Sequence, residues 1–357
     1  MSEIRVLEAI TPSRIGGAEI LVANLCESLP ELGAHVELFC PRGRPFVDYA
    51  AKRGVQCVTW KTHGKLDPVT LFRLRGLMRK QGFDVIHTHL STASLLGALA
   101  ARLAGRPSVA HVHGLNTATC FRCSTLVIAV SQAVKEHLCA QGIRKEKVRV
   151  VHNGVDLGKY EPVSVIDAKL KMGYDPEAPL FGVFGRLSNE KGQRVALEAM
   201  FILLASHPNA RLVLAGDGVD RDDLEAAADA LGITQSVQFA GFVRNVKHLM
   251  SACDAVVVPS LKEGFGLSAV EAMALERPVV ASAVGGLKEI VVEGETGVLV
   301  PPNDPRALAE SLVRLVKDKS LVQSLGKRGR ERVAERFELG AQTRLVYSIL
   351  REVGAGS

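Results

Sequence analysis

The sequence predicts an α/β protein made of two doubly wound domains, each a parallel sheet with helices on both faces. Three observations lead to this prediction. The chain has 357 residues, which suits two domains of ordinary size. Short apolar runs rich in β-branched residues alternate with longer segments of helical periodicity. These runs are almost continuously apolar, as strands are when a parallel sheet is covered on both faces.

The apolar runs form two series. In the first half, strands are expected at 4–9, 35–39, 55–59, 84–88, 108–112, 126–130 and 148–152. In the second half, they are expected at 180–184, 211–215, 237–239, 255–258, 278–281 and 298–300. Asn153-Gly154 is a turn signal, and the stretch 156–179 is polar and irregular, so we place a linker near 154–178. A last helix is expected over 337–353.

Composition excludes several classes of protein. With 47% hydrophobic and 23% charged residues, the chain is neither disordered nor collagen-like. The longest apolar stretch, 95–104, contains Arg102 and is too short to cross a bilayer. The first residues do not have the pattern of a secretory signal. The seven cysteines are odd in number and widely spaced, so we expect no disulfide framework and a cytoplasmic location.

Charge is distributed unevenly. Residues 1–155 carry 20 Lys and Arg against 11 Asp and Glu, whereas the rest of the chain carries 24 against 27. The basic first half indicates an anionic partner, such as a membrane surface, a phosphorylated acceptor or nucleic acid. Segment 70–80 reads as a helix with an apolar face and a basic face; it either packs on the sheet or lies on an anionic membrane.

Polar motifs follow the predicted strands, where open parallel sheets bind their ligands. The motif 185–192 begins at Gly185, and a helix is expected from near Gly192. Arg186 and Lys191 therefore lie between a strand end and a helix N-terminus. Positive side chains beside free backbone N–H groups favour a diphosphate. The alternative is an ordinary solvated loop.

A second motif, 259–274, also connects a strand to a helix. Gly264 and Gly266 permit close approach of the backbone to a ligand, and the first N–H groups of the helix point toward it. Glu271 is placed to accept hydrogen bonds from a vicinal diol such as a ribose, and Glu263 lies on the loop. Taken singly, each glutamate also fits a helix-end or surface acid.

Two further features lie in the first half. Gly16 and Gly17 follow the first strand, but the sequence there is not G-x-G-x-x-G, so the dinucleotide fingerprint is absent. His87 with His89, and His111 with His113, fall at two other strand ends. Such a histidine can bind a sugar hydroxyl or shuttle a proton, although a structural histidine is the commoner case.

The motifs of the chain, taken in order, resemble those of the retaining glycosyltransferases of family 4. They are GGAE at 16–19, HVHG at 111–114, NGVD at 153–156, GRLSNEKG at 185–192, GDG at 216–218, the Glu263-x7-Glu271 block, ERPVVAS and Gly285-Gly286. The resemblance covers essentially the whole chain, and the two-glutamate block is its most specific part. It implies the GT-B fold, with two Rossmann-like domains facing a central cleft. The family's last helix returns to the first domain, so the expected domains are 1–155 plus 337–357 for the acceptor and 156–336 for the nucleotide-sugar.

The resemblance also implies site residues. Arg186 and Lys191 match the pair that holds the donor diphosphate, Glu271 matches the ribose ligand, and Glu263 matches the glutamate beside the transferred sugar. His113 matches the histidine near the sugar ring. The remaining expected donor-binding residues are Gly16, Gly17, Gly185, Gly216, Phe242, Val243, Gly264, Phe265, Gly266, Leu267 and Ser268.

The implied activity is that of a hexosyltransferase with retention of configuration. A donor phosphate oxygen would assist front-face attack, fixed positive groups would replace a metal ion, and domain closure would assemble the site. We expect no cofactor, a nucleotide-sugar donor (UDP before GDP, on family frequency) and a glycan or lipid-linked acceptor. An anionic membrane surface is a further expected partner, with the enzyme peripheral on its cytoplasmic face; nucleic acid is not.

Four alternatives remain open at this point. Asp220-Arg221-Asp222 could bind a metal, although Asp220 also suits a helix cap. Cys120 and Cys123, with His111 and His113, could bind zinc. A sugar-nucleotide 2-epimerase shares the GT-B fold but fits the two-glutamate block less well. A non-catalytic nucleotide-sugar-binding protein would bind the donor without turning it over.

Overall fold

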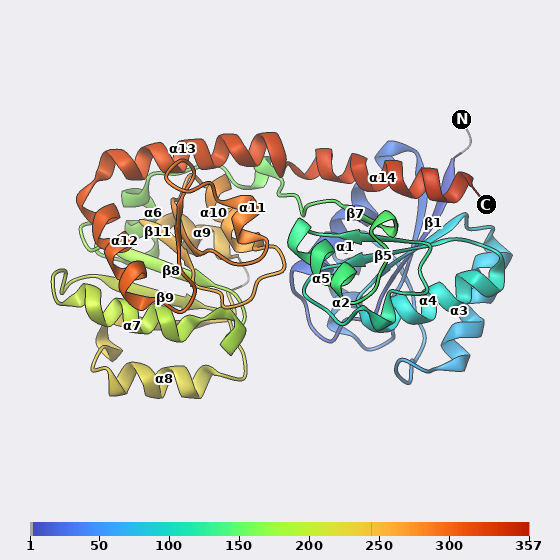
Figure 1. The fold of residues 1–357 in the computed structure, drawn as a ribbon, viewed down its shortest axis with the longest axis horizontal. Coiled ribbons are helices and arrows are strands. Elements are labelled where there is room, and N and C mark those ends of the chain that lie inside the picture. Colours follow the sequence, from blue (N-terminus) through green and yellow to red (C-terminus); the bar gives the residue numbers. More distant parts are fainter. Residues whose placement is uncertain (1–2, 244, 357) are drawn as a thin grey trace. The chain divides into compact units, whose positions relative to one another are not determined.

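The computed structural model describes residues 3–243 and 245–356. The chain divides into two compact units, here called unit 1 (Met1–Gly154 with Leu339–Ser357) and unit 2 (Val155–Glu338). Each unit contains one entirely parallel sheet flanked by helices (Figure 1). The predicted fold class, two doubly wound parallel-sheet domains, is confirmed.

The sheet of unit 1 has seven strands in the order β3-β2-β1-β4-β5-β6-β7. The strands are β1 (Ile4–Ile10), β2 (Ala34–Phe39), β3 (Cys57–Val58), β4 (Val85–His89), β5 (Ser108–Val112), β6 (Leu126–Ala129) and β7 (Val148–Val150). Each overlaps a strand expected from the sequence. The third is much shorter than the five residues expected, because only Leu38 and Phe39 of β2 pair with it.

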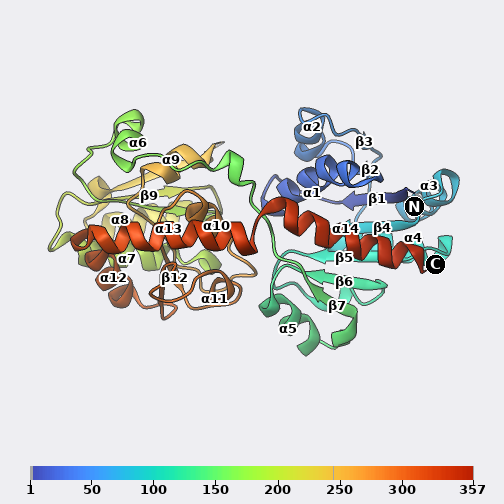
Figure 2. The ribbon, with the colours of Figure 1, turned by 90° about the horizontal axis from the view of Figure 1, so that it is seen from above.

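Six α-helices belong to unit 1. They are α1 (Gly17–Ser28), α2 (Pro45–Ala51), α3 (Pro68–Gln81), α4 (Ser91–Ala104), α5 (Gln132–Ala140) and α14 (Leu339–Ala355). Side chains of β1 alternate between the two faces of the sheet: Val6 packs with α1 and α14, and Leu7 packs with α3 and α4. Figure 2 shows α14 lying along the sheet, in contact with β1, β4 and β5.

The sheet of unit 2 has six strands in the order β10-β9-β8-β11-β12-β13. The strands are β8 (Leu180–Phe184), β9 (Arg211–Ala215), β10 (Val237–Gly241), β11 (Ala255–Val258), β12 (Val279–Ser282) and β13 (Val298–Val300). Every one of them overlaps an expected strand. Their side chains are almost entirely buried except in the edge strand β10, as the continuous apolar runs predict.

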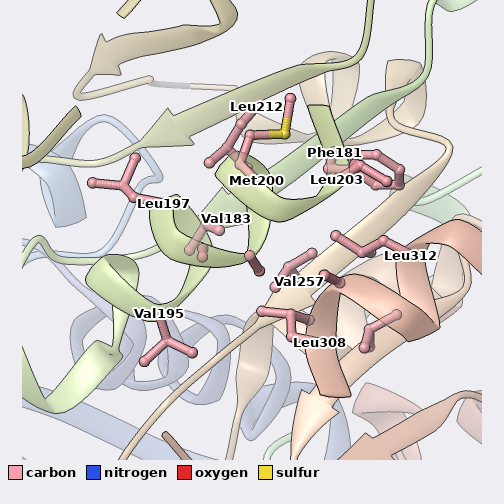
Figure 3. Close-up of a cluster of buried hydrophobic side chains, with 14 of the residues drawn as sticks. Phe181, Val183, Val195, Leu197, Met200, Leu203, Leu212, Val257, Leu308 and Leu312 are labelled. Carbon is pink, nitrogen blue, oxygen red and sulfur yellow. The ribbon is translucent and has the colours of Figure 1, made fainter. Parts of the chain in front are cut away.

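The helices of unit 2 are α6 (Val165–Met172), α7 (Gln193–Leu204), α8 (Arg221–Ala230), α9 (Val246–Ala252), α10 (Leu267–Ala274), α11 (Leu287–Ile290), α12 (Pro305–Lys317) and α13 (Lys319–Arg336). Figure 3 shows the core between the sheet and the α7 and α12 helices, where Met200 and Leu203 of α7 approach Leu308 and Leu312 of α12. Because this core holds α7 in place, it also fixes the position of the loop that ends where α7 begins.

The predicted irregular linker near 154–178 is wrong in part. Residues 165–172 form α6, which packs against α9 within unit 2. Its apolar residues Ile166 and Leu170 are more than half exposed, whereas Lys169 is buried and forms a 2.7 Å ion pair with Asp254. Because the buried residues are a lysine and the small Ala168 while two larger apolar residues face outward, the helix lacks the usual apolar face and could not be recognised.

In each sheet, successive strands of the chain are added first toward one edge and then, after a single reversal, toward the other edge. In unit 1 the reversal lies between β1 and β4, and in unit 2 between β8 and β11. Ligands of doubly wound sheets bind outside the carboxyl ends of the strands at this switch point. Within the described residues, no helix is long and apolar enough to cross a membrane.

Candidate active site

The loops that follow β8 and β11 meet at the switch point of unit 2. Lys191 Nζ donates to Glu263 Oε2 at 2.6 Å, and Ser260 Oγ donates to the same oxygen at 3.1 Å. Glu263 is only 9% exposed, whereas the Lys191 side chain is 30% exposed. Two residues 72 positions apart, both predicted from the sequence as site residues, are thus in direct contact.

Glycine makes this close approach of the loops possible. Gly192 has φ +66°, and a Cβ added there would lie 2.0 Å from the carbonyl oxygen of Pro259. Gly216, after β9, has φ +153°, and its Cβ would lie 1.9 Å from the oxygen of Gly185. Only glycine fits either position. The structure therefore shows Gly185 and Gly216 packed on each other, at the carboxyl ends of neighbouring strands.

Arg186 lies on the same loop as Lys191 but is exposed to solvent. Its guanidinium is 3.5 Å from the Glu190 carboxylate. Its backbone is held more firmly, because the buried Gln193 donates a hydrogen bond to the Arg186 carbonyl at 2.8 Å. The loop is thus fixed by α7 while the arginine side chain is free to turn toward an anion.

The N-terminus of α10 faces the same end of the sheet. Gly266 precedes the helix with φ +110°, so the N–H groups of Leu267 and Ser268 open the first turn. The side chain of Phe265, in contrast, is buried and packs edge-to-face on Phe337 at 5.9 Å. Its predicted place in the donor site can therefore involve only its backbone, next to Gly264.

A third loop, after β12, supports this segment from outside. A Cβ on Gly285 would lie 1.9 Å from the carbonyl oxygen of Glu263, and one on Gly286 would lie 2.6 Å from that of Gly264. The backbone N–H of Gly286 also donates to the Glu263 carbonyl at 3.3 Å. The loop that carries the glutamate is therefore held against the β12 loop through its backbone, which leaves the carboxylate to face Lys191 and Ser260.

Glu271, on α10, has a partner that the sequence did not indicate. Tyr160 Oη donates to Glu271 Oε1 at 2.7 Å, across 111 residues of chain. Burial raises the pKa of Glu271 to about 7, and the hydrogen bond from Tyr160 opposes this rise. Tyr160 lies in the segment that we predicted as linker. No periodic or motif signal marks it, so only the structure could find it.

At the edge of the sheet, Phe242 follows β10 directly. Its side chain is 73% exposed, while Val243 is half-buried. Gly241 has φ +64°, which turns the chain sharply before Phe242. An exposed aromatic ring at a strand's carboxyl end offers a flat apolar surface on which a planar base could stack.

The remaining predicted residues lie in unit 1. Gly16 precedes α1, and its backbone N–H donates to Glu19 Oε2 at 3.0 Å. Gly17 is the first residue of that helix. His113 follows β5, and its Nε2 is 3.0 Å from Nδ1 of His89. Burial, and then the nearby His87, lower the pKa of His113 to about 3, so its ring is neutral at physiological pH.

The larger pocket of unit 2 lies elsewhere. It is lined by residues such as Tyr174, Leu180, Arg211 and Val237, which include the amino ends of three strands. A much smaller hollow adjoins Lys191, Ser260 and Ser268 at the carboxyl ends. Because doubly wound sheets bind ligands at the carboxyl ends, we assign the site to the smaller hollow and its surrounding loops.

The chain matches known families along most of its length. Residues 15–159 match the model described as Glycosyltransferase Family 4, and residues 168–332 match the model described as Glycosyl transferases group 1. A 2-deoxystreptamine glucosyltransferase of Streptomyces kanamyceticus is 33% identical over 73% of this chain and 75% of its own length. The chain belongs to glycosyltransferase family 4.

Other relatives of this glycosyltransferase match nearly from end to end. A protein of Escherichia coli named UDP-Gal:alpha-D-GlcNAc-diphosphoundecaprenol alpha-1,3-galactosyltransferase is 28% identical over 95% of this chain and 94% of its own length. The crystal structure of Anabaena HepE in complex with UDP superposes with a TM-score of 0.88, at 24% identity, over 98% of this chain and all of the other. The fold is therefore GT-B, and the protein is an enzyme of the glycosyltransferase class, as predicted.

Among the described residues, neither alternative metal site forms a close group of three or more potential ligands. Asp220 precedes α8 as the sequence suggests, but its side chain makes no capping hydrogen bond. Among the described residues, one group of three or more potential ligands lies close enough for a metal, and it contains His87, His89 and His111. Neither the Asp220–Asp222 pair nor the two cysteines at 120 and 123 belong to this group; Cys120 is buried and Cys123 exposed.

Proposed function

We propose that this glycosyltransferase is a retaining enzyme that moves a hexose from a UDP-sugar to a glycan or lipid-linked acceptor. The observation that carries the proposal is the contact between Lys191 and Glu263 at the switch point of unit 2. It puts a cation and a carboxylate beside the first turn of α10. A diphosphate needs the positive charge, and the sugar attached to it needs the negative one. The UDP-bound relative and the UDP-Gal-dependent one support the choice of nucleotide.

The leaving group decides what this site must do. When the anomeric C–O bond breaks, negative charge grows on the diphosphate and positive charge on the sugar ring. Lys191, Arg186 and the N–H groups at the start of α10 would stabilise the former, and Glu263 the latter. The acceptor oxygen would bond to the anomeric carbon on the face that the diphosphate leaves, and its proton would pass to a phosphate oxygen of the donor. No metal ion at the diphosphate enters this scheme.

Recognition of the nucleoside would involve two further groups. Glu271, held by Tyr160, would accept hydrogen bonds from the ribose hydroxyls, and the exposed ring of Phe242 would stack on the base. His113, with Gly16 and Gly17, would contact the sugar and phosphate from unit 1. His89 Nε2 donates to Glu8, so His89 Nδ1 accepts from His113 Nε2, and His113 Nδ1 is left to accept a hydrogen bond from a sugar hydroxyl.

The first test is thermal unfolding of the whole protein with UDP, GDP, ADP or dTDP, each in EDTA. A ligand at 100 times its Kd adds about 2.7 kcal/mol to stability, which is visible as a shift in Tm. We expect UDP to stabilise selectively. Absence of any shift at millimolar UDP would contradict the proposal, and stabilisation by GDP alone would reassign the base.

A second test concerns the reaction itself. With UDP-hexose and a lipid-linked acceptor, NMR of the product should show the anomeric configuration of the donor. A product that lacks any acceptor-linked sugar, with the configuration at C2 of the hexose inverted, would instead favour the epimerase alternative, which shares this fold. Binding without turnover would favour the non-catalytic one.

We further propose that α3 contacts an anionic membrane. Asp67 caps this helix by accepting hydrogen bonds from the backbone N–H groups of Val69 and Thr70. Thr70, Leu74 and Met78 are buried against the unit 1 sheet. In contrast, the apolar residues Leu66, Val69 and Phe72 are 86%, 52% and 59% exposed.

The surroundings of these three residues are basic. The exposed cations nearest to them in the sequence are Lys61, Lys65, Arg73, Arg79 and Lys80. A mixed apolar and basic surface of this kind suits the interface of an anionic bilayer, with the apolar side chains inserted among the acyl chains. It would bring the acceptor-binding unit to a lipid-linked acceptor.

A further inference from the structure

Unit 1 contains a buried cluster of histidines around one carboxylate. Glu8 of β1 and His87 and His89 of β4 have no exposed surface, and His111 of β5 is 2% exposed. His87 Nδ1 and His89 Nε2 each lie 2.8 Å from a different oxygen of Glu8. The cluster sits at the switch point of the unit 1 sheet, because β1 and β4 are the strands between which the order reverses.

The hydrogen bonds to Glu8 fix which ring nitrogens carry protons. A carboxylate only accepts, so His87 Nδ1 and His89 Nε2 must donate. The opposite nitrogens, His87 Nε2 and His89 Nδ1, then carry lone pairs, and that of His89 accepts a hydrogen bond from His113 Nε2 at 3.0 Å, which a metal ion would replace. Neutral imidazoles with their second nitrogen held by a carboxylate are the form in which histidine binds metals.

Several of these nitrogens lack any hydrogen-bond partner in the described part of the chain. They are His87 Nε2, both ring nitrogens of His111, and His113 Nδ1. Leaving a polar atom buried and unpaired is unfavourable. The rings do contact one another: His111 stacks on His113 with centroids 4.8 Å apart and on His89 at 5.4 Å. The nitrogens of His111 are thus held among other imidazoles with nothing to bind.

We propose that His87, His89 and His111 bind one divalent transition-metal ion, with Zn²⁺ the preferred occupant, and that Glu8 orients two of these ligands. One nitrogen from each ring lies within 4.8 Å of one from each other ring. Three points so spaced lie within about 2.8 Å of a common point, against Zn–N bonds of about 2.0–2.1 Å. Each ring therefore needs to move by less than about 1 Å.

The ligand set selects the class of ion. Imidazole nitrogens suit Zn²⁺, Cu²⁺, Ni²⁺ and Fe²⁺, whereas Mg²⁺ and Mn²⁺ prefer oxygen ligands. The metal would join β1, β4 and β5 at the switch point. Through His111, which stacks on His113, it would also hold the ring of His113 in place. His113 is then a residue positioned by the metal site. This inference is independent of the transfer chemistry proposed for unit 2.

The test uses the whole protein, freed of any affinity tag that binds metal. We expect the protein, produced with zinc in the medium, to carry about one Zn per chain. After treatment with a strong chelator, added Zn²⁺ should raise the Tm by several degrees. Co²⁺ in its place should give a visible absorption band that the metal-free protein lacks, while Mg²⁺ should change neither property.

Two variants and a control locate the ion. His111→Gln and His87→Gln should each lose the bound Zn and the Co²⁺ spectrum. His248→Gln, which changes an exposed histidine of unit 2, should keep both. Should the cluster variants fail to fold, the wild-type protein still decides. A wild-type chain without Zn, without the Co²⁺ spectrum and without a Tm response would overturn the proposal, and so would folded cluster variants that bind Zn as the wild type does.

Discussion

Lys191 and Glu263 form a 2.6 Å ion pair that joins the loops after β8 and β11 across the switch point of unit 2. The oxygen of Glu263 that accepts this bond also accepts one from Ser260. A partly exposed cation and a buried carboxylate are thus held next to each other before any substrate arrives. In the proposed reaction, a diphosphate that enters here would compete with Glu263 for the ammonium, and the carboxylate would then be released to face the sugar.

Replacing Lys191 should therefore affect turnover far more than folding. In Lys191→Ala, Glu263 keeps its hydrogen bond from Ser260, so the fold should persist, while loss of a preorganised contact with the leaving group should lower kcat by about 10²–10³. The exposed neighbour Lys262 is the matched control, and Lys262→Ala should keep normal activity. Steady-state kinetics and circular dichroism of both variants check this. Near-normal turnover of Lys191→Ala would remove the diphosphate assignment.

The raised pKa of Glu271 predicts a pH dependence of nucleotide binding. Only the ionised carboxylate can accept hydrogen bonds from both ribose hydroxyls, and with a pKa of about 7 its ionised fraction rises about tenfold from pH 6 to pH 8. The affinity for UDP should rise by up to the same factor. Calorimetric titration at several pH values measures it, and in Glu271→Gln this rise should disappear. A rise that persists in Glu271→Gln would belong to another group.

The same residue predicts a trend in the stability of the ligand-free protein. Its pKa is about 4.5 when unfolded and about 7 when folded, so between these values the folded state binds more protons. The contribution of Glu271 to the free energy of unfolding therefore falls as pH rises through this window. Tyr160→Phe removes the hydrogen bond that favours the ionised form, so it should steepen the fall. Urea unfolding at pH 5 and pH 7.5 compares the variants, and an unchanged slope in Tyr160→Phe would contradict the role of Tyr160.

The close contact at Gly192 predicts a large effect from one methyl group. Gly192→Ala places a Cβ against the carbonyl of Pro259, and it also introduces alanine at a positive φ. Gly105→Ala separates the two effects, since Gly105 has φ +72° but no atom within 4 Å of its added Cβ. In the control, the free energy of unfolding should fall by only about 1–2 kcal/mol, which is the cost of placing alanine in the left-handed region. Gly192→Ala should lose clearly more, together with nucleotide binding. Equal Tm values for the two variants would show that the loops are not in tight contact.

The proposed membrane contact of α3 depends on its exposed apolar residues. Phe72→Ser with Val69→Ser should weaken sedimentation with vesicles of anionic lipid and leave the fold intact, because both side chains are more than half exposed. Phe201→Ser on α7, which changes a phenylalanine that is 51% exposed in unit 2, is the control. Sedimentation that does not depend on anionic lipid would contradict the proposal. So would sedimentation that Phe201→Ser weakens as much as the double change on α3 does.

The strands could be predicted from the sequence because burial on both faces leaves a continuous apolar run that charged loops interrupt. The run at 211–215 and the run at 255–258 coincide with β9 and β11 residue for residue. Site residues that directly follow such strands could be predicted for the same reason. Lys191 and Glu263, for example, were identified because they lie on the loops after β8 and β11. The two-glutamate motif added the resemblance that identifies the family.

What escaped prediction depends on contacts that cross long stretches of chain. Tyr160 is important only because α10 brings Glu271 beside it, and Phe265 is removed from the ligand side only because Phe337 receives its ring. The α6 helix was missed because one of its two buried residues is a lysine paired with Asp254. The meeting of Glu8 with His87 was missed because it depends on the register of β1 on β4, where the two residues pair directly.

The position of α14 has a consequence for the order in which the protein is made. Val346, Ile349 and Leu350 of this helix share a core with Val6 and Val85 at the opposite end of the chain. Unit 2, from 155 to 338, is continuous and leaves the ribosome complete. The first 154 residues emerge earlier but must wait for the last helix to cover one face of their sheet. Synthesis from the amino terminus thus completes the second unit first, the reverse of the usual order.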